Sequence, residues 1–160
     1  MAETEVATVT IITHECFASL WVDAPELLRR HWEEIAAFHD IPLSVDVARY
    51  QALERANGLR ILTARIDGAL VGYAVFIVST HGHYQTSKQA LQDVFYVAPE
   101  HRGSRIGLKL IKASEALLRA EQCQVVYQHV KCAHPELGRL LEHQGYEKHE
   151  WIYGKRLDKD

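Results

Sequence analysis

The segment Arg102-Gly-Ser-Arg-Ile-Gly107 has the composition of a loop that binds an anion. It stands between an apolar stretch that ends near Pro99 and a second stretch with helical periodicity. A loop that enters a helix in this way directs several backbone N–H groups and the positive end of the helix dipole toward one point, and Arg102 and Arg105 add formal charge. The segment therefore suits a phosphate or a pyrophosphate group, and the surrounding chain has to indicate which ligand carries it.

Two smaller groups of reactive side chains have simpler structural explanations. His81 and His83 could supply half of a metal site, but the sequence offers no third ligand, so we expect a polar loop and no metal. Cys132 could act as a nucleophile with His129 as its base. Because residues three positions apart on a strand point to opposite faces, a partly buried, unreactive thiol is the better interpretation.

The size and composition are those of one globular domain, which we expect over residues 1–160, with 48% hydrophobic and 24% charged residues. A net charge of −3 gives no reason to expect a surface that binds nucleic acid. Residues 1–5 lack the basic start of a signal peptide and the longest apolar segment, 69–78, is too short to span a bilayer, so we expect a cytoplasmic protein without membrane contact. The three cysteines lack C-x-x-C spacing and are expected to be reduced and partly buried.

The first half of the chain predicts a strand, two helices and a hairpin. The strand spans 6–12, where β-branched residues are frequent. Asp23 resembles the N-cap of a first helix, which would bury Leu28, Trp32, Ile35 and Phe38. A second helix begins near Asp46, buries Val47, Tyr50 and Leu53, and ends at Asn57-Gly58. Residues 59–66 and 70–78 then form the hairpin around Asp67-Gly68.

The second half of the chain predicts a crossover unit around the anion-binding loop. A polar loop at 80–88 leads into a strand at 90–97, and the helix after the loop has an apolar stripe of Ile106, Leu110, Ala113 and Leu117. A strand at 124–130 should lie parallel to 90–97, since a helix separates the two. A short helix at 135–144 and a long strand at 146–157 complete the chain.

This order of elements resembles the GNAT family of acetyl-CoA-dependent acyltransferases over nearly the whole chain. The family motif Arg/Gln-x-x-Gly-x-Gly/Ala is similar to Arg102-Gly-Ser-Arg-Ile-Gly107, with Arg105 where the central glycine belongs, so its side chain could crowd the pyrophosphate or pair with it. The resemblance implies an α/β fold: a mixed, mostly antiparallel sheet with one central parallel pair of strands and about four helices. It also implies acetyl-CoA as co-substrate and no metal.

The resemblance assigns a set of residues to the cofactor. Three lie along the pantetheine arm, namely Phe95, Tyr96 and Val97, and others surround the pyrophosphate, namely Arg102, Gly103, Ser104, Arg105, Ile106, Gly107 and Leu108. His134 stands where relatives often place an asparagine that touches the cofactor.

The resemblance implies that an amine attacks the thioester directly, without a covalent enzyme intermediate. Such a reaction needs a base or a water to take the proton of the amine, and an N–H dipole for the oxyanion. Asp93 stands where some polyamine-acetylating relatives carry an acid proposed as the base, although a solvated acid at a strand end is the alternative. The tyrosine that relatives use to protonate the thiolate is replaced by Leu141, so Tyr146, Tyr127 or water would take its place.

The acceptor side of the family fold gives weaker expectations. His81 and His83 lie in a loop that faces the acceptor in relatives, and the acids Glu33 and Glu34 lie on the helix that walls the acceptor pocket. An acidic wall would attract a protonated amine, but these acids equally fit a solvated helix face. We therefore expect a small-molecule or peptide amine as acceptor, and a second copy of the chain is a candidate partner.

Two other functions remain compatible with the sequence. A catalytically silent member of the same fold could bind acyl-CoA as a sensor or interaction module, because Leu141 and Arg105 depart from the family pattern. An unrelated nucleotide-binding α/β domain is the second alternative. The antiparallel strands before the loop argue against it, since such domains usually open with a strand, a loop and a helix.

Overall fold

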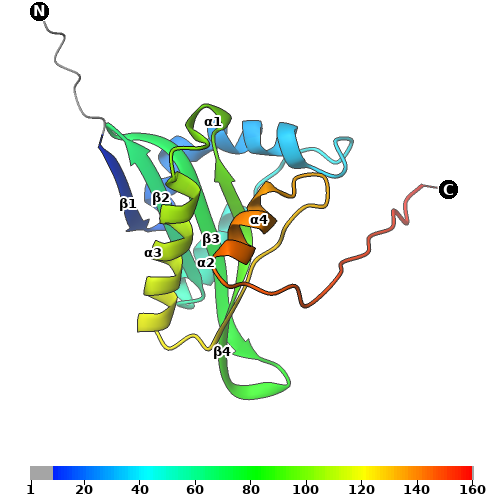
Figure 1. The fold of residues 1–160 in the computed structure, drawn as a ribbon. Helices are drawn as coiled ribbons and strands as arrows, with labels where there is room; N and C mark the ends of the chain where they lie inside the picture. Colours follow the sequence, from blue (N-terminus) through cyan, green and yellow to red (C-terminus); the bar gives the residue numbers. More distant parts are fainter. Residues whose placement is uncertain (1–8, 160) are drawn as a thin grey trace, which may run out of the picture. The chain divides into compact units, whose positions relative to one another are not determined.

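The computed structural model describes residues 9–159 and contains a five-stranded sheet in the order β1-β2-β3-β4-β5 (Figure 1). The β4–β5 pair is parallel and the other neighbours are antiparallel. The strands are β1 (Thr10–Glu15), β2 (Leu59–Ile66), β3 (Ala69–His81), β4 (Tyr84–Val97) and β5 (Val125–Tyr127). The mixed α/β architecture expected from the sequence is confirmed.

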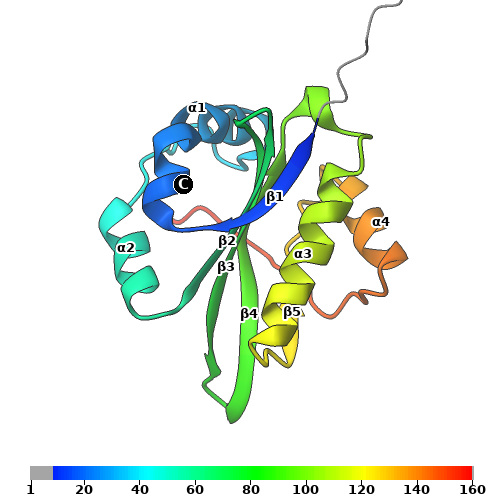
Figure 2. The same ribbon diagram turned by 90° about the vertical axis from the view of Figure 1, so that its left-hand side faces the viewer.

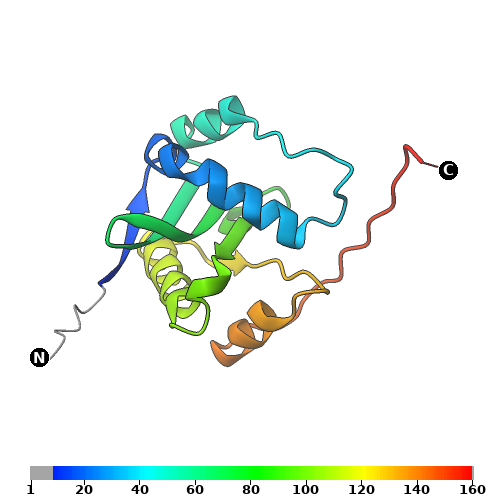
Figure 3. The same cartoon turned by 90° about the horizontal axis from the view of Figure 1, so that it is seen from above.

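Three helices cover the two faces of this sheet. They are α1 (Phe17–Ile35), α2 (Val47–Arg55) and α3 (Ile106–Ala120), with a 3-10 turn at Pro99–His101. Helices α1 and α2 lie on one face and α3 on the other (Figures 2 and 3). Two apolar cores result, because side chains of alternate strand positions point to opposite faces: Phe76 and Leu110 belong to the core under α3, and Phe17 and Tyr73 to the core under α1 and α2.

The chain divides into two compact units at His129. The second unit, from Val130 onward, contains α4 (Glu136–His143). Gly145 follows α4 in the left-handed conformation, with φ of +87°, as expected for a residue that ends a helix. The single domain expected over residues 1–160 stays a prediction.

Two local predictions, a helix cap and a hairpin turn, are confirmed. The side chain of Asp46 accepts a hydrogen bond of 2.9 Å from the backbone N–H of Arg49 and thereby caps α2. The hairpin turn stands at Asp67-Gly68, where both residues have positive φ. In the described residues, no helix is both long and apolar enough to cross a membrane.

The predicted start of the first helix is wrong. Helix α1 begins at Phe17, after Cys16, and Pro25 lies inside it. The buried positions Phe17, Leu20, Ala24, Leu27 and His31 form a continuous helical stripe, and the burial of this stripe outweighs the local start signal at Asp23. The predicted inward face is therefore displaced by about one residue. Its members Leu28, Trp32 and Ile35 are only half-buried, and Phe38 is exposed beyond the helix.

Three further predicted elements differ in the structure. The polar loop expected at 80–88 is instead the end of the long β3–β4 hairpin, with His81 opposite Tyr84, because two extended strands satisfy each other's backbone groups even where their side chains are polar. The strand expected at 146–157 has no regular secondary structure, so β5 ends the sheet and the parallel pair stands at its edge. The strand expected at 6–12 begins at Thr10, and its first part, 6–8, lies outside the described residues.

The cysteines also differ from expectation. All three are free thiols, but Cys16 and Cys132 are exposed, and Cys123 alone is partly buried.

Candidate functional site

Strand β4 separates from β5 in its second half. The parallel ladder ends at Leu91, opposite Tyr127, while β4 continues to Val97 along β3. Asp93 is an extra residue in the pairing with β3, since Phe76 lies opposite Gln92 and Val75 opposite Val94. A bulge of this kind bends a strand and interrupts its ladder. The edge of residues 94–97 therefore has backbone groups outside the β4–β5 ladder, where an extended ligand could pair with them.

The loop after β4 leads directly into α3. Gly103 and Arg105 both adopt left-handed backbone conformations, with φ of +84° and +63°. Backbone N–H groups in such alternating conformations form an anion-binding concavity, and the first N–H groups of α3 have no partner within the helix. Apart from Gly103 and its two neighbours in the chain, no described heavy atom lies within 4 Å of the place where a Cβ on Gly103 would stand. The loop thus has the backbone geometry and the open space that an anion requires.

The conformation of Arg105 explains why a glycine suits this position. Arg105 is the N-cap of α3 and is left-handed, a conformation that costs a non-glycine residue roughly 1–2 kcal/mol. Glycine adopts it without that cost. The arginine therefore keeps the backbone shape of the loop at some expense of stability and adds a positive charge beside the N-terminus of α3.

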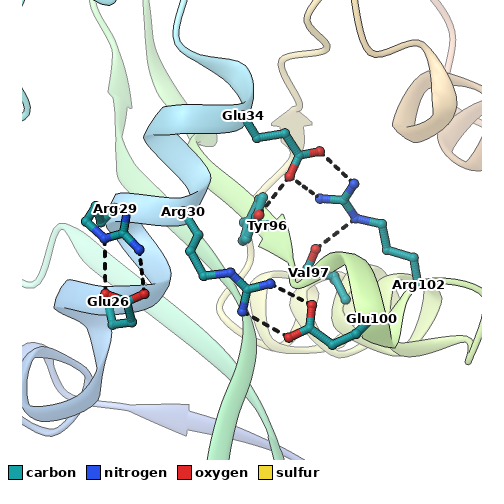
Figure 4. Close-up of polar contacts among 8 residues, drawn as sticks. All are labelled: Glu26, Arg29, Arg30, Glu34, Tyr96, Val97, Glu100 and Arg102. Carbon is teal, nitrogen blue, oxygen red and sulfur yellow. Dashed lines mark hydrogen bonds and ion pairs between the residues drawn. The ribbon is translucent and has the colours of Figure 1, made fainter.

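A network of ion pairs joins α1 to this loop (Figure 4). The guanidinium of Arg102 donates to both carboxylate oxygens of Glu34, at 2.6 and 2.8 Å, and its Nε donates to the carbonyl of Val97 at 2.9 Å. The hydroxyl of Tyr96 donates to Glu34 at 2.7 Å. Burial, followed by this hydrogen bond, raises the pKa of Tyr96 to about 12, so the phenol keeps its proton. Glu34 thus connects α1 with both the end of β4 and the loop.

A second bidentate pair lies beside the first. The guanidinium of Arg30 donates to the two carboxylate oxygens of Glu100 at 2.9 and 2.6 Å (Figure 4). The hydrogen bond from Arg30 lowers the pKa of Glu100 to about 2. Bidentate arginine pairs fix geometry better than single contacts do. The loop is therefore held against α1 at two points, Glu100 and Arg102.

Below this network lies a buried histidine. His31 is 8% exposed, and its Nδ1 lies 2.8 Å from the hydroxyl of Tyr73. Its ring stacks on that of Tyr96 with centroids 4.5 Å apart. The stack supports the side chain of Tyr96, which in turn contacts Glu34.

On the same face of the sheet, Asp93 borders a cavity of about 410 Å³ between α1, α2 and the strands. The hydroxyl of Tyr50, on α2, donates to the carboxylate of Asp93 at 2.5 Å. Burial and then this hydrogen bond raise the pKa of Tyr50, so the phenol stays protonated and remains a donor. The bulge thus places a carboxylate with a fixed partner in the lining of the cavity, directly before residues 94–97 of β4.

The remaining predicted site residues do not join this arrangement. Glu33 pairs with Arg29 on the exposed face of α1. His81 and His83 lie at the tip of the β3–β4 hairpin, where the N–H of His83 donates to Nδ1 of His81. At roughly 3.3 Å per residue, the tip is about 30 Å along β4 from Asp93. Among residues 9–159, no group of three His, Cys, Asp or Glu is placed to hold a metal ion.

Two predicted residues, His134 and Tyr146, belong to the second unit. His134 lies just before α4, where its N–H donates to the carbonyl of Lys131, and the N–H of Tyr146 donates to the carbonyl of Leu141 after α4. Their roles toward the cofactor and the leaving thiol stay predictions.

Residues 14–146 match the model of the acetyltransferase (GNAT) family. The chain belongs to the GNAT acetyltransferase family. Acyl transfer is the reaction class of this family, and the GNAT resemblance of the sequence is thereby confirmed. No curated protein matches the chain.

Solved structures of GNAT acetyltransferases share the fold at low sequence identity. An aminoglycoside N-acetyltransferase in complex with CoA has a TM-score of 0.74 at 15% identity, with 98% of this chain and 100% of that chain covered. A ribosomal-protein-alanine N-acetyltransferase from Brucella melitensis biovar Abortus 2308 has a TM-score of 0.68 at 22% identity, covering 93% and 99%. A glucosamine-6-phosphate N-acetyltransferase from Arabidopsis thaliana has a TM-score of 0.72 at 14% identity, covering 94% and 99%.

Sequence reasoning missed two partners of the predicted GNAT site residues. Tyr50 was expected to point inward from α2, but nothing near it in the sequence indicates a bond to Asp93. The burial of His31, which continues the apolar stripe of α1, was not predicted. Inward-facing polar residues within an apolar stripe are the signal that could have identified both.

The ion-pair network gives a prediction for stability. Replacing Glu34 with glutamine removes the charge that receives Arg102 and weakens the bond to Tyr96, so we expect the free energy of unfolding to fall by about 1–2 kcal/mol. The matched control is Glu33→Gln, which breaks an exposed pair with Arg29 and should cost less than about 0.5 kcal/mol. Urea denaturation of both variants measures the difference. Equal losses would mean that the network does not stabilise the loop.

Proposed function

We propose that this protein is an N-acetyltransferase that moves the acetyl group of acetyl-CoA directly to an amine. The observation that carries the proposal is the position of Asp93. Its bulge lies in the lining of the cavity, which would fit an acceptor, and directly before residues 94–97 of β4, which extend beyond the β4–β5 ladder and would fit an extended pantetheine arm. A base at this junction is within reach of an amine that approaches from the cavity.

The chain's residues fit the cofactor at both of its polar parts. Backbone groups of Phe95, Tyr96 and Val97 would pair with the amides of the pantetheine arm, and the loop from Arg102 to Leu108 would hold the pyrophosphate. The left-handed residues Gly103 and Arg105 turn successive N–H groups toward that anion. Bound acetyl-CoA supplies an activated thioester.

We propose roles in the reaction for Asp93, Tyr50 and Tyr146. Asp93 takes a proton from the amine, directly or through a water, and Tyr50 holds the carboxylate in place. Tyr146 or a water returns a proton to the leaving sulfur, because Leu141 stands where relatives carry a tyrosine. We also propose a cytoplasmic location, and a second copy of the chain remains a candidate partner.

The test is the release of free thiol from acetyl-CoA in the presence of a panel of amines, beside calorimetric titration with CoA. We expect CoA to bind and at least one amine to be acetylated. Clear CoA binding without any turnover would refute the enzyme and favour a silent acyl-CoA sensor, which Leu141 in place of the tyrosine supports. Tighter binding of ATP or NAD than of CoA would refute both.

A further inference from the structure

The cavity beside Asp93 has an aromatic and aliphatic wall. The ring of Phe17 stacks on the rings of Trp21 and Tyr50, with centroids 5.6 and 5.2 Å apart. Leu28 and Leu43 are also among its lining residues. Its volume of about 410 Å³ lies in the range of small-molecule sites, roughly 300–1,000 Å³. The shape and the lining thus suit a compact, apolar group.

Few charged groups line the cavity, and they comprise two carboxylates and one guanidinium. They are Asp46, Arg49 and Asp93. The carboxylates of Asp46 and Asp93 each accept one hydrogen bond, from the backbone N–H of Arg49 and from the hydroxyl of Tyr50, and Arg49 is itself a cation. The three groups together carry one net negative charge, which one ammonium group balances. Asp93 is the carboxylate joined to the stacked rings through Tyr50, so it is the better partner for an amine whose apolar group contacts those rings. A second ammonium would exceed the negative charge of the lining, and the other carboxylate, Asp46, stands within one helical turn of the cation Arg49.

We propose that the acceptor is a primary monoamine with an aromatic or branched apolar group, and this inference rests on the proposed function. The amine faces Asp93, and the apolar group contacts the rings of Phe17, Trp21 and Tyr50. Polyamines and aminoglycosides, which carry several ammonium groups, are poor fits to this lining. The proposed acceptor class therefore differs from the aminoglycosides in the name of the structural neighbour solved with CoA.

The transfer of the acetyl group requires no reactant besides acetyl-CoA and the amine. An ammonium first gives one proton to Asp93 or to water. The C–N bond of the amide then forms as the C–S bond of the thioester breaks, and the remaining surplus proton of the nitrogen ends on the sulfur. The products are an N-substituted acetamide and CoA with a free thiol.

Acceptor preference tests the proposal directly. Thiol release with phenethylamine and with isoamylamine should give kcat/KM roughly tenfold or more above the values for spermidine, kanamycin and glucosamine 6-phosphate. A preference for any of these three amines would refute the proposed apolar acceptor, whereas the proposed acetyltransferase activity would stand. If CoA binds but no amine is used, the proposed function itself has failed and the inference fails with it.

A matched pair of variants locates the site of contact. Leu43 is 39% exposed and lines the cavity, whereas Ile41 is 49% exposed, lies in the same loop and does not line it. Leu43→Gln should raise the KM for phenethylamine roughly three- to tenfold, because apolar contact is lost, with an unchanged KM for acetyl-CoA. Ile41→Gln should leave both values unchanged. Equal effects of the two variants, or none for Leu43→Gln, would contradict binding in this cavity.

Discussion

Asp93→Asn is expected to lower turnover by about 10²–10³-fold while CoA still binds with its normal affinity. An amide has nearly the shape of the carboxylate and can still accept the hydrogen bond from Tyr50, but it cannot take a proton from the amine. The loss should therefore fall on kcat, and the pH profile of the residual activity should change shape. Thiol release gives the rates, and calorimetric titration gives the affinity for CoA.

The matched control for this variant is Asp67→Asn. Asp67 lies in the exposed turn between β2 and β3, with φ of +49°, a conformation that asparagine tolerates at least as well. Its replacement makes the same chemical change away from the cavity and should leave kcat unaltered. If Asp93→Asn also keeps its rate, Asp93 has no part in the proton transfer and the base must be sought among waters in the site.

Gly72→Ala is expected to reduce the free energy of unfolding by about 1–3 kcal/mol and to weaken CoA binding. A Cβ on Gly72 would stand 2.9 Å from the carbonyl oxygen of Tyr96 and 3.3 Å from a methyl group of Val97. The closest of these atoms belongs to the backbone of β4, so the strand itself has to move. Because Tyr96 and Val97 belong to the proposed pantetheine edge, that movement displaces the groups that would pair with the cofactor.

Gly82→Ala provides the comparison for Gly72→Ala. Gly82 lies in the tip of the β3–β4 hairpin, and apart from Gly82 and its two neighbours in the chain no described heavy atom is within 4 Å of the place where its Cβ would stand. We expect a change of less than about 0.5 kcal/mol and no effect on CoA binding. Urea denaturation and calorimetry on both variants measure the two effects. Normal stability of Gly72→Ala would show that β4 can shift without cost at this point.

The parts of the fold that depend on local sequence were predicted well. Asp46 caps a helix through its own side chain, Asp67-Gly68 turns a hairpin through its own backbone, and the apolar stripe that begins at Ile106 packs α3 on the sheet. In each case the decisive interaction lies within a few residues of the signal. The family motif could be located for the same reason.

The predictions failed where contacts between residues far apart in the sequence determine the structure. The residues around Asp23 do favour a helix start locally, but burial of Phe17 and Leu20 against the sheet stabilises a helix that begins earlier. Likewise, the sequence did not predict that Glu34 binds Arg102 from the loop after β4, and its proposed place in the wall of the acceptor pocket stays a prediction. No spacing rule in the sequence connects two side chains that only the fold brings together.

The bulge at Asp93 also has a consequence for how this chain can vary in evolution. Gln92 and Val94 lie opposite consecutive residues of β3. Deletion of residue 93 would therefore make the pairing of β4 with β3 regular, and every other side chain of β4 would stay on its present face of the sheet. Both cores would keep their members, and only the carboxylate and the bend in the strand would disappear. The proposed base is thus carried by a residue that the sheet itself does not need, and one insertion or deletion can add or remove it independently of the fold.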